Sequence, residues 1–152
     1  QQTGEQCSCG ACSVCMLFGC GNARKTKSPT RLVFRDCPPT SSTVKTWGEA
    51  SIDSELKAEV KINRTTGTTS NGSAPRTTER IPAGSDFDFA FSLRIFEGDN
   101  LRDFYEKLAE GFELLEKHYL GGSGSRGYGQ VAIIAADGAP MAAHLRAQAK
   151  EM

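Results

Sequence analysis

A nine-residue segment, Gly121–Gly129, has the sequence Gly-Gly-Ser-Gly-Ser-Arg-Gly-Tyr-Gly and combines residue types that can bind a polyanion. Its five glycines let backbone N–H groups approach a ligand closely. Between the glycines lie a cationic side chain, an aromatic ring and two hydroxyl groups, which suit a nucleic-acid backbone better than a small apolar ligand. We therefore predict a loop that binds nucleic-acid phosphates through Gly121, Gly122, Ser123, Gly124, Ser125, Arg126, Gly127 and Tyr128.

Other glycine-rich motifs fit this segment less well. Gly122, Gly124 and Gly127 match the dinucleotide fingerprint G-x-G-x-x-G, which requires a strand before it and a helix after it. Here a helical pattern precedes the loop, and an apolar segment that we predict to be a strand, 131–134, follows it. A Walker loop lacks its Gly-Lys-Ser/Thr, and the kinase glycine loop would place Val at position 129. A flexible linker remains the alternative interpretation.

Five of the six cysteines lie between positions 7 and 20. The spacing Cys9-x-x-Cys12-x-x-Cys15 overlays two C-x-x-C motifs, which can direct sulfur atoms toward one tetrahedral metal ion. We predict a structural zinc ion in a knuckle over residues 7–22, and the ligands that we assign are Cys7, Cys9, Cys12 and Cys15. Cys20 is the alternative to Cys7 or Cys9.

Three competing uses of these cysteines are weaker. Disulfides between such close neighbours would be strained, and nothing else indicates an oxidising compartment. The ferredoxin motif would continue with further cysteines and a proline, whereas Met-Leu-Phe follows Cys15. A thioredoxin-like redox pair needs a different surrounding fold. The sixth cysteine, Cys37, is predicted to be a small buried apolar residue.

Length and charge limit the class of protein. The 152 residues suit one domain, and 18 basic residues balance 18 acidic ones. The charges are segregated, since 24–35 and 57–80 are mainly basic whereas 97–116 is mainly acidic. This pattern favours one polyanion-facing surface and an opposite face that is solvated or contacts a partner, although ordinary solvated faces are the alternative. No apolar run approaches the length of a membrane span, so we expect no membrane partner.

The predicted sheet consists of alternating apolar segments. Residues 31–35 form one predicted strand, and residues 56–63 alternate as in a half-buried strand. Residues 87–95 alternate strictly and predict a long strand. We expect residues 56–95 to form a long hairpin whose polar excursion, 63–80, becomes ordered only on binding, with a disordered surface loop as the alternative. Its nucleic-acid contacts are predicted to be Arg64, Arg76 and Arg80.

A helix is predicted over residues 99–120, with an N-cap at Asp99-Asn100 and a stop at Gly121. Its apolar residues repeat at helical spacing and should form the core rather than a ligand site. A shorter helix is predicted over 141–152. Helices packed on an antiparallel sheet give an α+β class, with a palm of ferredoxin-like or RNA-recognition type.

Four blocks of the chain, in order, resemble the RAMP superfamily of repeat-associated CRISPR proteins. Residues 114–131 resemble the glycine-rich signature of that superfamily. Residues 12–19, followed by 31–36, look like the zinc-knuckle region of its type III backbone subunits. Residues 61–67 and 79–84 resemble the two sides of the thumb hairpin of those subunits.

This resemblance implies a Csm/Cmr-type subunit, or one such domain of a fused effector, that polymerises along CRISPR guide RNA. In the family the glycine loop and palm hold the guide, and the thumb separates guide from target RNA so that a base is displaced at regular intervals. On this basis Arg31, in the second block, joins the predicted RNA-binding residues. The implied partners are guide RNA, target RNA and other subunits, including copies of the chain. The implied location is the cytoplasm of a prokaryote, and the implied cofactor is structural Zn²⁺.

The catalytic residue is not assigned. Type III members of the family cut target RNA with an aspartate in a loop that precedes the zinc region. The first βαβ part of the palm also precedes that region in the family. This chain begins with Gln1, at the zinc region. We therefore expect it to be a processed product, a recombinant fragment or part of a longer polypeptide whose palm is incomplete here. Asp36 matches the strand block and is not given the cleavage role.

Two other functions compete with guide binding. A zinc-dependent enzyme is disfavoured because four thiolates leave no open position for water. The two histidines, His118 and His144, form no H-x-E pair of the deaminase type, and His118 is predicted to lie on a helix surface. A zinc-stapled protein-interaction module without an RNA role is the second alternative.

Overall fold

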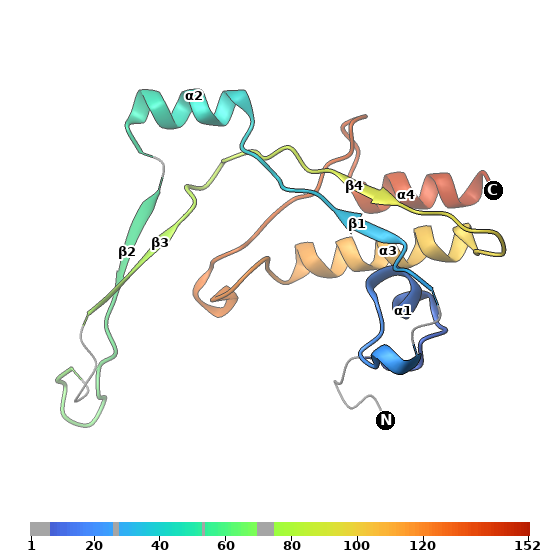
Figure 1. Cartoon of the computed structure of the whole chain (residues 1–152). Coiled ribbons are helices and arrows are strands. Elements are labelled where there is room, and N and C mark those ends of the chain that lie inside the picture. Colours follow the sequence, from blue (N-terminus) through green and yellow to red (C-terminus); the bar gives the residue numbers. More distant parts are fainter. Residues whose placement is uncertain (1–6, 26–27, 53, 70–74) are drawn as a thin grey trace. The chain divides into compact units, whose positions relative to one another are not determined.

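The computed structural model describes residues 7–25, 28–52, 54–69 and 75–152. The chain forms two compact units (Figure 1). Unit 1 comprises Gln1–Phe34 and Phe91–Met152, and unit 2 comprises Arg35–Ala90. Among the described residues, no helix is long and apolar enough to cross a bilayer.

Unit 1 packs two long helices and a short sheet around one core. Strands β1 (Leu32–Phe34) and β4 (Phe91–Leu93) pair antiparallel, with Leu32 opposite Leu93. Helix α3 (Leu101–Lys117) packs against α4 (Met141–Lys150), and the short helix α1 (Ser13–Phe18) also contacts α3 (Figure 1). The buried core consists of Leu17, Leu32, Phe104, Leu108, Ala109, Phe112, Ala142 and Leu145. The predicted strand 31–35 and both predicted helices are therefore confirmed as elements.

Helix α3 begins where predicted but ends earlier. The Asn100 side-chain oxygen accepts the Asp103 N–H at 3.2 Å, which caps the helix as expected. The helix ends at Lys117, and the His118 N–H donates to the carbonyls of Leu114 and Leu115. The predicted end at residue 120 with Gly121 as the stop is therefore wrong. Tyr119 lies outside the helix and is exposed, because the backbone leaves helical geometry at His118.

The predicted strand over 131–134 does not form. One isolated bridge joins Ile134 to Pro140, and no strand includes these residues. Instead, a side chain and a neighbouring backbone group form hydrogen bonds with the N–H and carbonyl groups of Ile133. The Ile133 N–H donates to the Glu116 carboxylate at 2.6 Å, and the Ile133 carbonyl accepts the Met141 N–H at 2.8 Å. This segment thereby packs between α3 and the start of α4 without a neighbouring strand.

Unit 2 contains a helix and a hairpin. Strand β2 (Glu55–Glu59) pairs antiparallel with β3 (Arg76–Arg80), with Glu55 opposite Arg80. The sequence-based prediction paired this segment with 87–95, so the partner was wrong. Helix α2 (Ser41–Ala50) was not predicted. It begins at an N-cap, Thr40, whose hydroxyl accepts the Thr43 N–H at 3.2 Å.

The alternation in β2 is real, but the burial is the reverse of that predicted. Leu56 is 68% exposed and Ile62, beyond the strand, is 61% exposed. The polar face is partly buried because its charges pair across the hairpin, Glu55 with Arg80 at 2.7 Å and Glu59 with Arg76 at 3.7 Å. Ion pairs therefore decide which face of this two-stranded hairpin is shielded.

The strict alternation of residues 87–95 produces only a short strand. Regular pairing covers Phe91–Leu93, and one bridge joins Phe87 to Pro39. Between them, the Asp88 N–H donates to the Pro38 carbonyl and the Arg35 N–H donates to the Ala90 carbonyl. The segment is extended and hydrogen-bonded, but its hydrogen bonds to residues 35–39 do not follow the regular pattern of one long strand.

Candidate metal centre and nucleic-acid interface

The four predicted zinc ligands come together. The Sγ atoms of Cys7, Cys9, Cys12 and Cys15 all lie within 4.8 Å of one another. Those of Cys7 and Cys12 are 3.7 Å apart, and those of Cys9 and Cys15 are 3.9 Å apart. A tetrahedral zinc ion with Zn–S bonds of about 2.3 Å separates its sulfurs by about 3.8 Å. Because a disulfide needs about 2.05 Å, this geometry fits a four-thiolate metal site and not a pair of bridges.

Local hydrogen bonds and burial act differently on the thiols of the cluster. Cys12 is the N-cap of α1, and its Sγ accepts the Cys15 N–H at 3.5 Å. The Cys9 Sγ accepts the N–H groups of Ala11 at 3.4 Å and Cys12 at 3.3 Å. These bonds lower the pKa of Cys9 to about 6 and favour the thiolate, which is the form that binds metal. A backbone hydrogen bond at Gly10 lowers the pKa of Cys15, but burial and the neighbouring thiols outweigh it and raise that pKa to about 12.

The knuckle folds against itself and packs on the core of unit 1, to which it belongs. Gly10 has a φ of +74°, and a Cβ there would lie 2.3 Å from the Lys25 carbonyl oxygen, so only glycine fits this turn. The Leu17 side chain is completely buried in the core of unit 1. The Ser13 hydroxyl donates to the Asp103 carboxylate, which joins α1 to α3. The metal site is thus attached directly to the domain core.

The other two cysteines lie outside this cluster. The Cys20 Sγ accepts the Asn22 N–H at 3.4 Å and is not among the four converging sulfurs. The structure therefore favours Cys7 and Cys9 over Cys20 as ligands. Cys37 is exposed, so the prediction that it is buried is wrong. It belongs to the irregular extended segment and not to a core-facing strand.

The glycine-rich loop is a closed turn. The Leu120 N–H donates to the Gly129 carbonyl at 2.8 Å, which joins the two ends of the loop. A short 3₁₀ helix, η2 (Gly124–Arg126), forms the middle, and the Gly127 N–H returns to the Gly124 carbonyl at 2.9 Å. This internal bonding differs from that of a flexible linker.

Two of the glycines are required by the chain itself. A Cβ on Gly124 would lie 1.9 Å from the Tyr119 ring, and one on Gly129 would lie 2.1 Å from the Leu120 carbonyl oxygen. Sequence reasoning had assigned close approach to a ligand instead. By contrast, a Cβ added to Gly121, Gly122 or Gly127 meets no atom within 4 Å. The side of the loop that remains open is therefore formed by these glycines, with exposed Ser125 and Arg126 between them.

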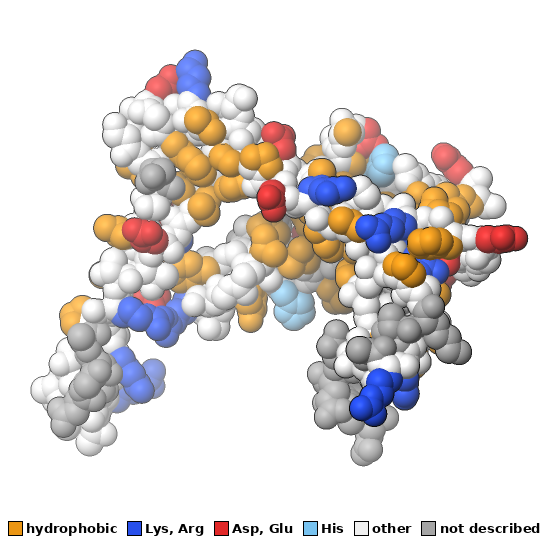
Figure 2. Space-filling model, in the orientation of Figure 1, with side chains coloured by type: hydrophobic (Ala, Val, Ile, Leu, Met, Phe, Trp, Pro, Cys, Tyr) orange, Lys and Arg blue, Asp and Glu red, His pale blue; other side chains and the backbone are white. Residues whose placement is uncertain are grey.

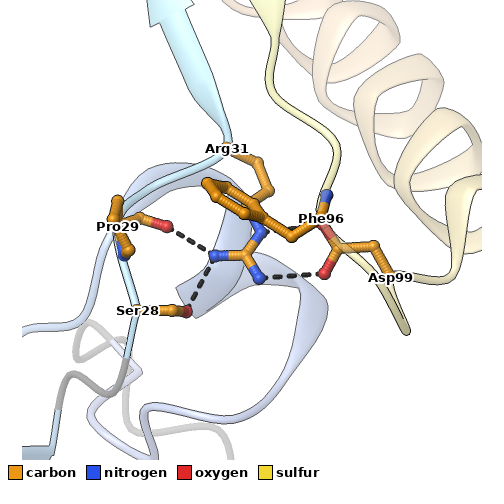
Figure 3. A network of polar contacts seen from close by, with 5 residues as sticks. All are labelled: Ser28, Pro29, Arg31, Phe96 and Asp99. Atoms are coloured by element: carbon orange, nitrogen blue, oxygen red, sulfur yellow. Dashed lines mark hydrogen bonds and ion pairs between the residues drawn. The ribbon is translucent and has the colours of Figure 1, made fainter.

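Arg31 has a structural role that excludes the predicted RNA contact. It is 5% exposed and lies in a polar network with Asp99 (Figure 3). Its Nε and Nη2 donate to the two Asp99 carboxylate oxygens, each at 2.9 Å, and Nη1 donates to Ser28 and Pro29. The Phe96 ring lies 4.5 Å from the guanidinium carbon. We correct the assignment because every guanidinium nitrogen is occupied and the side chain is buried.

Asp99 was interpreted from the sequence only as part of a helix cap. The Arg31 guanidinium, which hydrogen-bonds its carboxylate, lowers the pKa of Asp99 below its usual range. The Phe96 N–H donates to the same carboxylate at 3.0 Å. Nothing in the local pattern identifies a partner so far away in the sequence.

The hairpin of unit 2 carries the remaining predicted contacts. Lys and Arg side chains lie along it, with acidic side chains interspersed (Figure 2). Arg76 and Arg80 pair with the glutamates of β2, whereas Arg64 lies exposed in a turn. The Gly67 N–H closes this turn by donating to the Asn63 carbonyl at 2.9 Å. Residues 70–74 of the predicted thumb lie outside the described residues.

Known proteins resemble this chain in sequence. Three relatives are named "CRISPR system Cms endoribonuclease Csm3". The protein of Methanothermobacter thermautotrophicus is 38% identical over 143 residues, which cover 84% of this chain and 56% of the relative. The protein of Methanocaldococcus jannaschii is 38% identical over 123 residues, which cover 81% of this chain and 48% of the relative. The protein of Streptococcus thermophilus is 38% identical over 120 residues, which cover 77% of this chain and 52% of the relative. The chain thus spans about half the length of these relatives.

A solved structure shares the fold. A chain in the "Crystal structure of Csm3-Csm4 subcomplex in the type III-A CRISPR-Cas interference complex" matches with a TM-score of 0.56 and 22% identity, over 96% of this chain and 69% of that one. The sequence model of the RAMP superfamily matches residues 3–132, which include the cysteine cluster, the hairpin and the glycine-rich loop. On this match, the chain belongs to the RAMP superfamily.

Proposed function

We propose that this chain binds CRISPR guide RNA as a repeated backbone unit of a type III effector complex that recognises target RNA in a prokaryotic cytoplasm. Membership of the RAMP superfamily supports the proposal, as do relatives named as Csm3 proteins. The Csm3-Csm4 subcomplex that shares the fold supports other subunits of such a complex as partners. We propose copies of this chain as further partners.

The observation that carries the proposal is the geometry of the glycine-rich loop. The Leu120–Gly129 bond closes the loop, and the Tyr119 ring lies beneath Gly124. The open side is left with small residues and exposed Arg126, so a phosphate can approach backbone N–H groups and a cation together. Such contacts position an RNA backbone without reading its bases.

We assign the hairpin of β2 and β3, with residues 63–80, as a thumb that contacts the guide–target duplex. Arg64 is its exposed cation, and Arg76 and Arg80 are held by acidic neighbours on β2. We assign structural Zn²⁺ to Cys7, Cys9, Cys12 and Cys15. A bound ion would cross-link residues 7–15 and stabilise the knuckle that Leu17 anchors to the core.

The alternatives fare less well. A hydrolytic zinc centre needs an open coordination position, and four converging thiolates leave none. We assign no catalytic residue for RNA cleavage, although the curated relatives carry the word endoribonuclease in their names. An interaction module without an RNA role predicts no salt-dependent RNA affinity, which the following experiment measures.

The test is the affinity for single-stranded guide RNA as a function of salt. Arg126→Ala should weaken binding similarly for unrelated RNA sequences and reduce the slope of log K against log salt by about 0.7, as expected for one lost phosphate contact. Arg102→Ala is the matched control, because it removes the same charge from an exposed position at the other end of α3. Equal effects of the two substitutions, or no salt-dependent binding by the wild type, would contradict the proposal.

A further inference from the structure

Unit 2 contains a small cavity that the RNA-binding proposal does not use. Its volume is about 180 Å³, and it lies between α2 and the segment 82–86. The helix contributes Ser42, Thr43, Thr46 and Trp47, and hydrophobic side chains gather over this helix (Figure 2). Trp47 is half-buried and packs edge-on against Phe87, with 6.2 Å between ring centroids, so its position is fixed.

Several polar groups around the cavity already bond to one another. The Trp47 Nε1–H donates to the Ser85 hydroxyl at 3.1 Å, and that hydroxyl donates to the Pro82 carbonyl at 2.8 Å. The Thr46 hydroxyl donates to the Ser42 carbonyl at 3.0 Å. The Asp86 backbone N–H donates to the Thr43 hydroxyl at 2.8 Å. The lining also offers acceptors, and among them the carboxylate of exposed Asp86 is the one that carries a charge.

We propose that this cavity receives the guanidinium group of an arginine side chain from a protein partner. A guanidinium is flat and rich in donors, so it can stack on the Trp47 indole while it donates to the Asp86 carboxylate and to carbonyl oxygens. The residues that line the cavity include no lysine or arginine that would repel it. Arginine is also among the residues that most often anchor protein interfaces.

The local charge favours a cationic protein side chain over RNA. Asp86 is the one charged residue among those that line the cavity. A phosphate would meet the Asp86 carboxylate with no lining cation to neutralise it. Arginine binding in this cavity does not require that the chain bind guide RNA.

Trp47 is the single tryptophan of the chain, so its fluorescence reports on this cavity. The full chain would be titrated with the peptide acetyl-Gly-Arg-Gly-amide and with its citrulline counterpart, which has a flat side chain of nearly the same shape but no charge. The arginine peptide should change the emission saturably. The citrulline peptide should bind at least about tenfold more weakly, because its ureido group keeps N–H donors but lacks the positive charge that pairs with the Asp86 carboxylate.

Asp86→Asn should lower the affinity for the arginine peptide at least about tenfold. Asp88→Asn, the matched control in the same segment, should leave this affinity unchanged. Equal effects of the two variants, equal binding of the two peptides, or no response to the arginine peptide would overturn the proposal. A change in Trp47 emission on adding an RNA oligonucleotide, with no change on adding the arginine peptide, would also overturn it.

If Asp86→Asn disturbs the fold, Ser42→Arg provides the second test. Its guanidinium should fill the cavity and protect Trp47 from acrylamide quenching, and Ser42→Gln should not; equal quenching of these two variants would also contradict the proposal.

Discussion

Arg31 and Asp99 are separated by 68 positions in the sequence and form a buried two-point ion pair, with both N–O distances at 2.9 Å. Their side chains are 6% and 5% exposed. The pair joins the start of β1 to the turn before α3, and the Phe96 ring covers the guanidinium. Removing either partner leaves an uncompensated buried charge, so each position is sensitive to substitution.

The first prediction concerns acid stability. The Arg31 guanidinium lowers the folded-state pKa of Asp99, so the pair contributes stability that is fully present above the unfolded-state pKa of about 3.9. This contribution is lost as the pH falls through the lower, folded-state pKa. Asp99→Asn should therefore reduce the free energy of unfolding at pH 7, and its deficit relative to wild type should shrink at strongly acidic pH.

Urea unfolding curves at a series of pH values measure this. Asp88→Asn, at an exposed position in unit 2, is the control and should show no such pH-dependent deficit. A deficit for Asp99→Asn that stays constant from pH 7 to pH 2 would show that the ion pair does not stabilise the fold.

The second prediction concerns the metal. Cys12→Ser or Cys15→Ser should abolish stoichiometric zinc binding and destabilise unit 1, because metal binding and folding are coupled. Cys20→Ser should retain one zinc per chain, since its sulfur lies outside the cluster, and Cys37→Ser is a second control. Metal analysis together with thermal unfolding provides the readout. Zinc loss in Cys20→Ser with retention in Cys7→Ser would reverse the ligand assignment.

The third prediction concerns the glycine-rich loop. Gly124→Ala places a Cβ within 1.9 Å of the Tyr119 ring, so the loop must shift and its RNA affinity should fall by about tenfold, the effect of one lost charged contact. Gly111→Ala is the matched control, because its Cβ meets nothing within 4 Å and it lies in α3, outside the loop. Tyr119→Ala in the Gly124→Ala background should restore part of the affinity. If Gly124→Ala leaves the RNA affinity unchanged, or if Gly111→Ala weakens binding as much, the closed loop is not what binds RNA.

The fourth prediction concerns the proposed thumb. Deleting residues 66–73 removes none of the buried core residues in the part of the chain that the structure describes, so folding and zinc content should be unchanged. Within an assembled complex the deletion should abolish the periodic exposure of displaced bases along the guide. Chemical probing of the guide RNA measures that exposure, with Arg102→Ala assembled in parallel as a control. A guide that is uniformly protected in both the wild-type and deleted complexes would contradict the thumb assignment.

Local sequence patterns were sufficient wherever the responsible forces act over a few residues. The spacing Cys9-x-x-Cys12-x-x-Cys15 predicted the cluster because neighbouring backbone turns bring those sulfurs together. The apolar repeat predicted α3, and Asn100 predicted its start, because periodicity and capping are properties of consecutive residues. The glycine-rich segment was correctly recognised as a distinctive loop.

Tertiary contacts decided the remaining features. Alternation cannot reveal which strand is the partner, so the hairpin of 55–59 with 76–80 was missed and the strand over 87–95 was predicted too long. Two-stranded pairing and cross-strand ion pairs left Leu56 exposed despite its apolar pattern. Arg31 looked like a free cation because Asp99 is distant in the sequence, and only folding brings the two together. Gly124 likewise looked like a ligand contact until the structure showed the Tyr119 ring against it. Each of these outcomes depends on which distant group fills the space beside a residue, and the surrounding sequence does not contain that information.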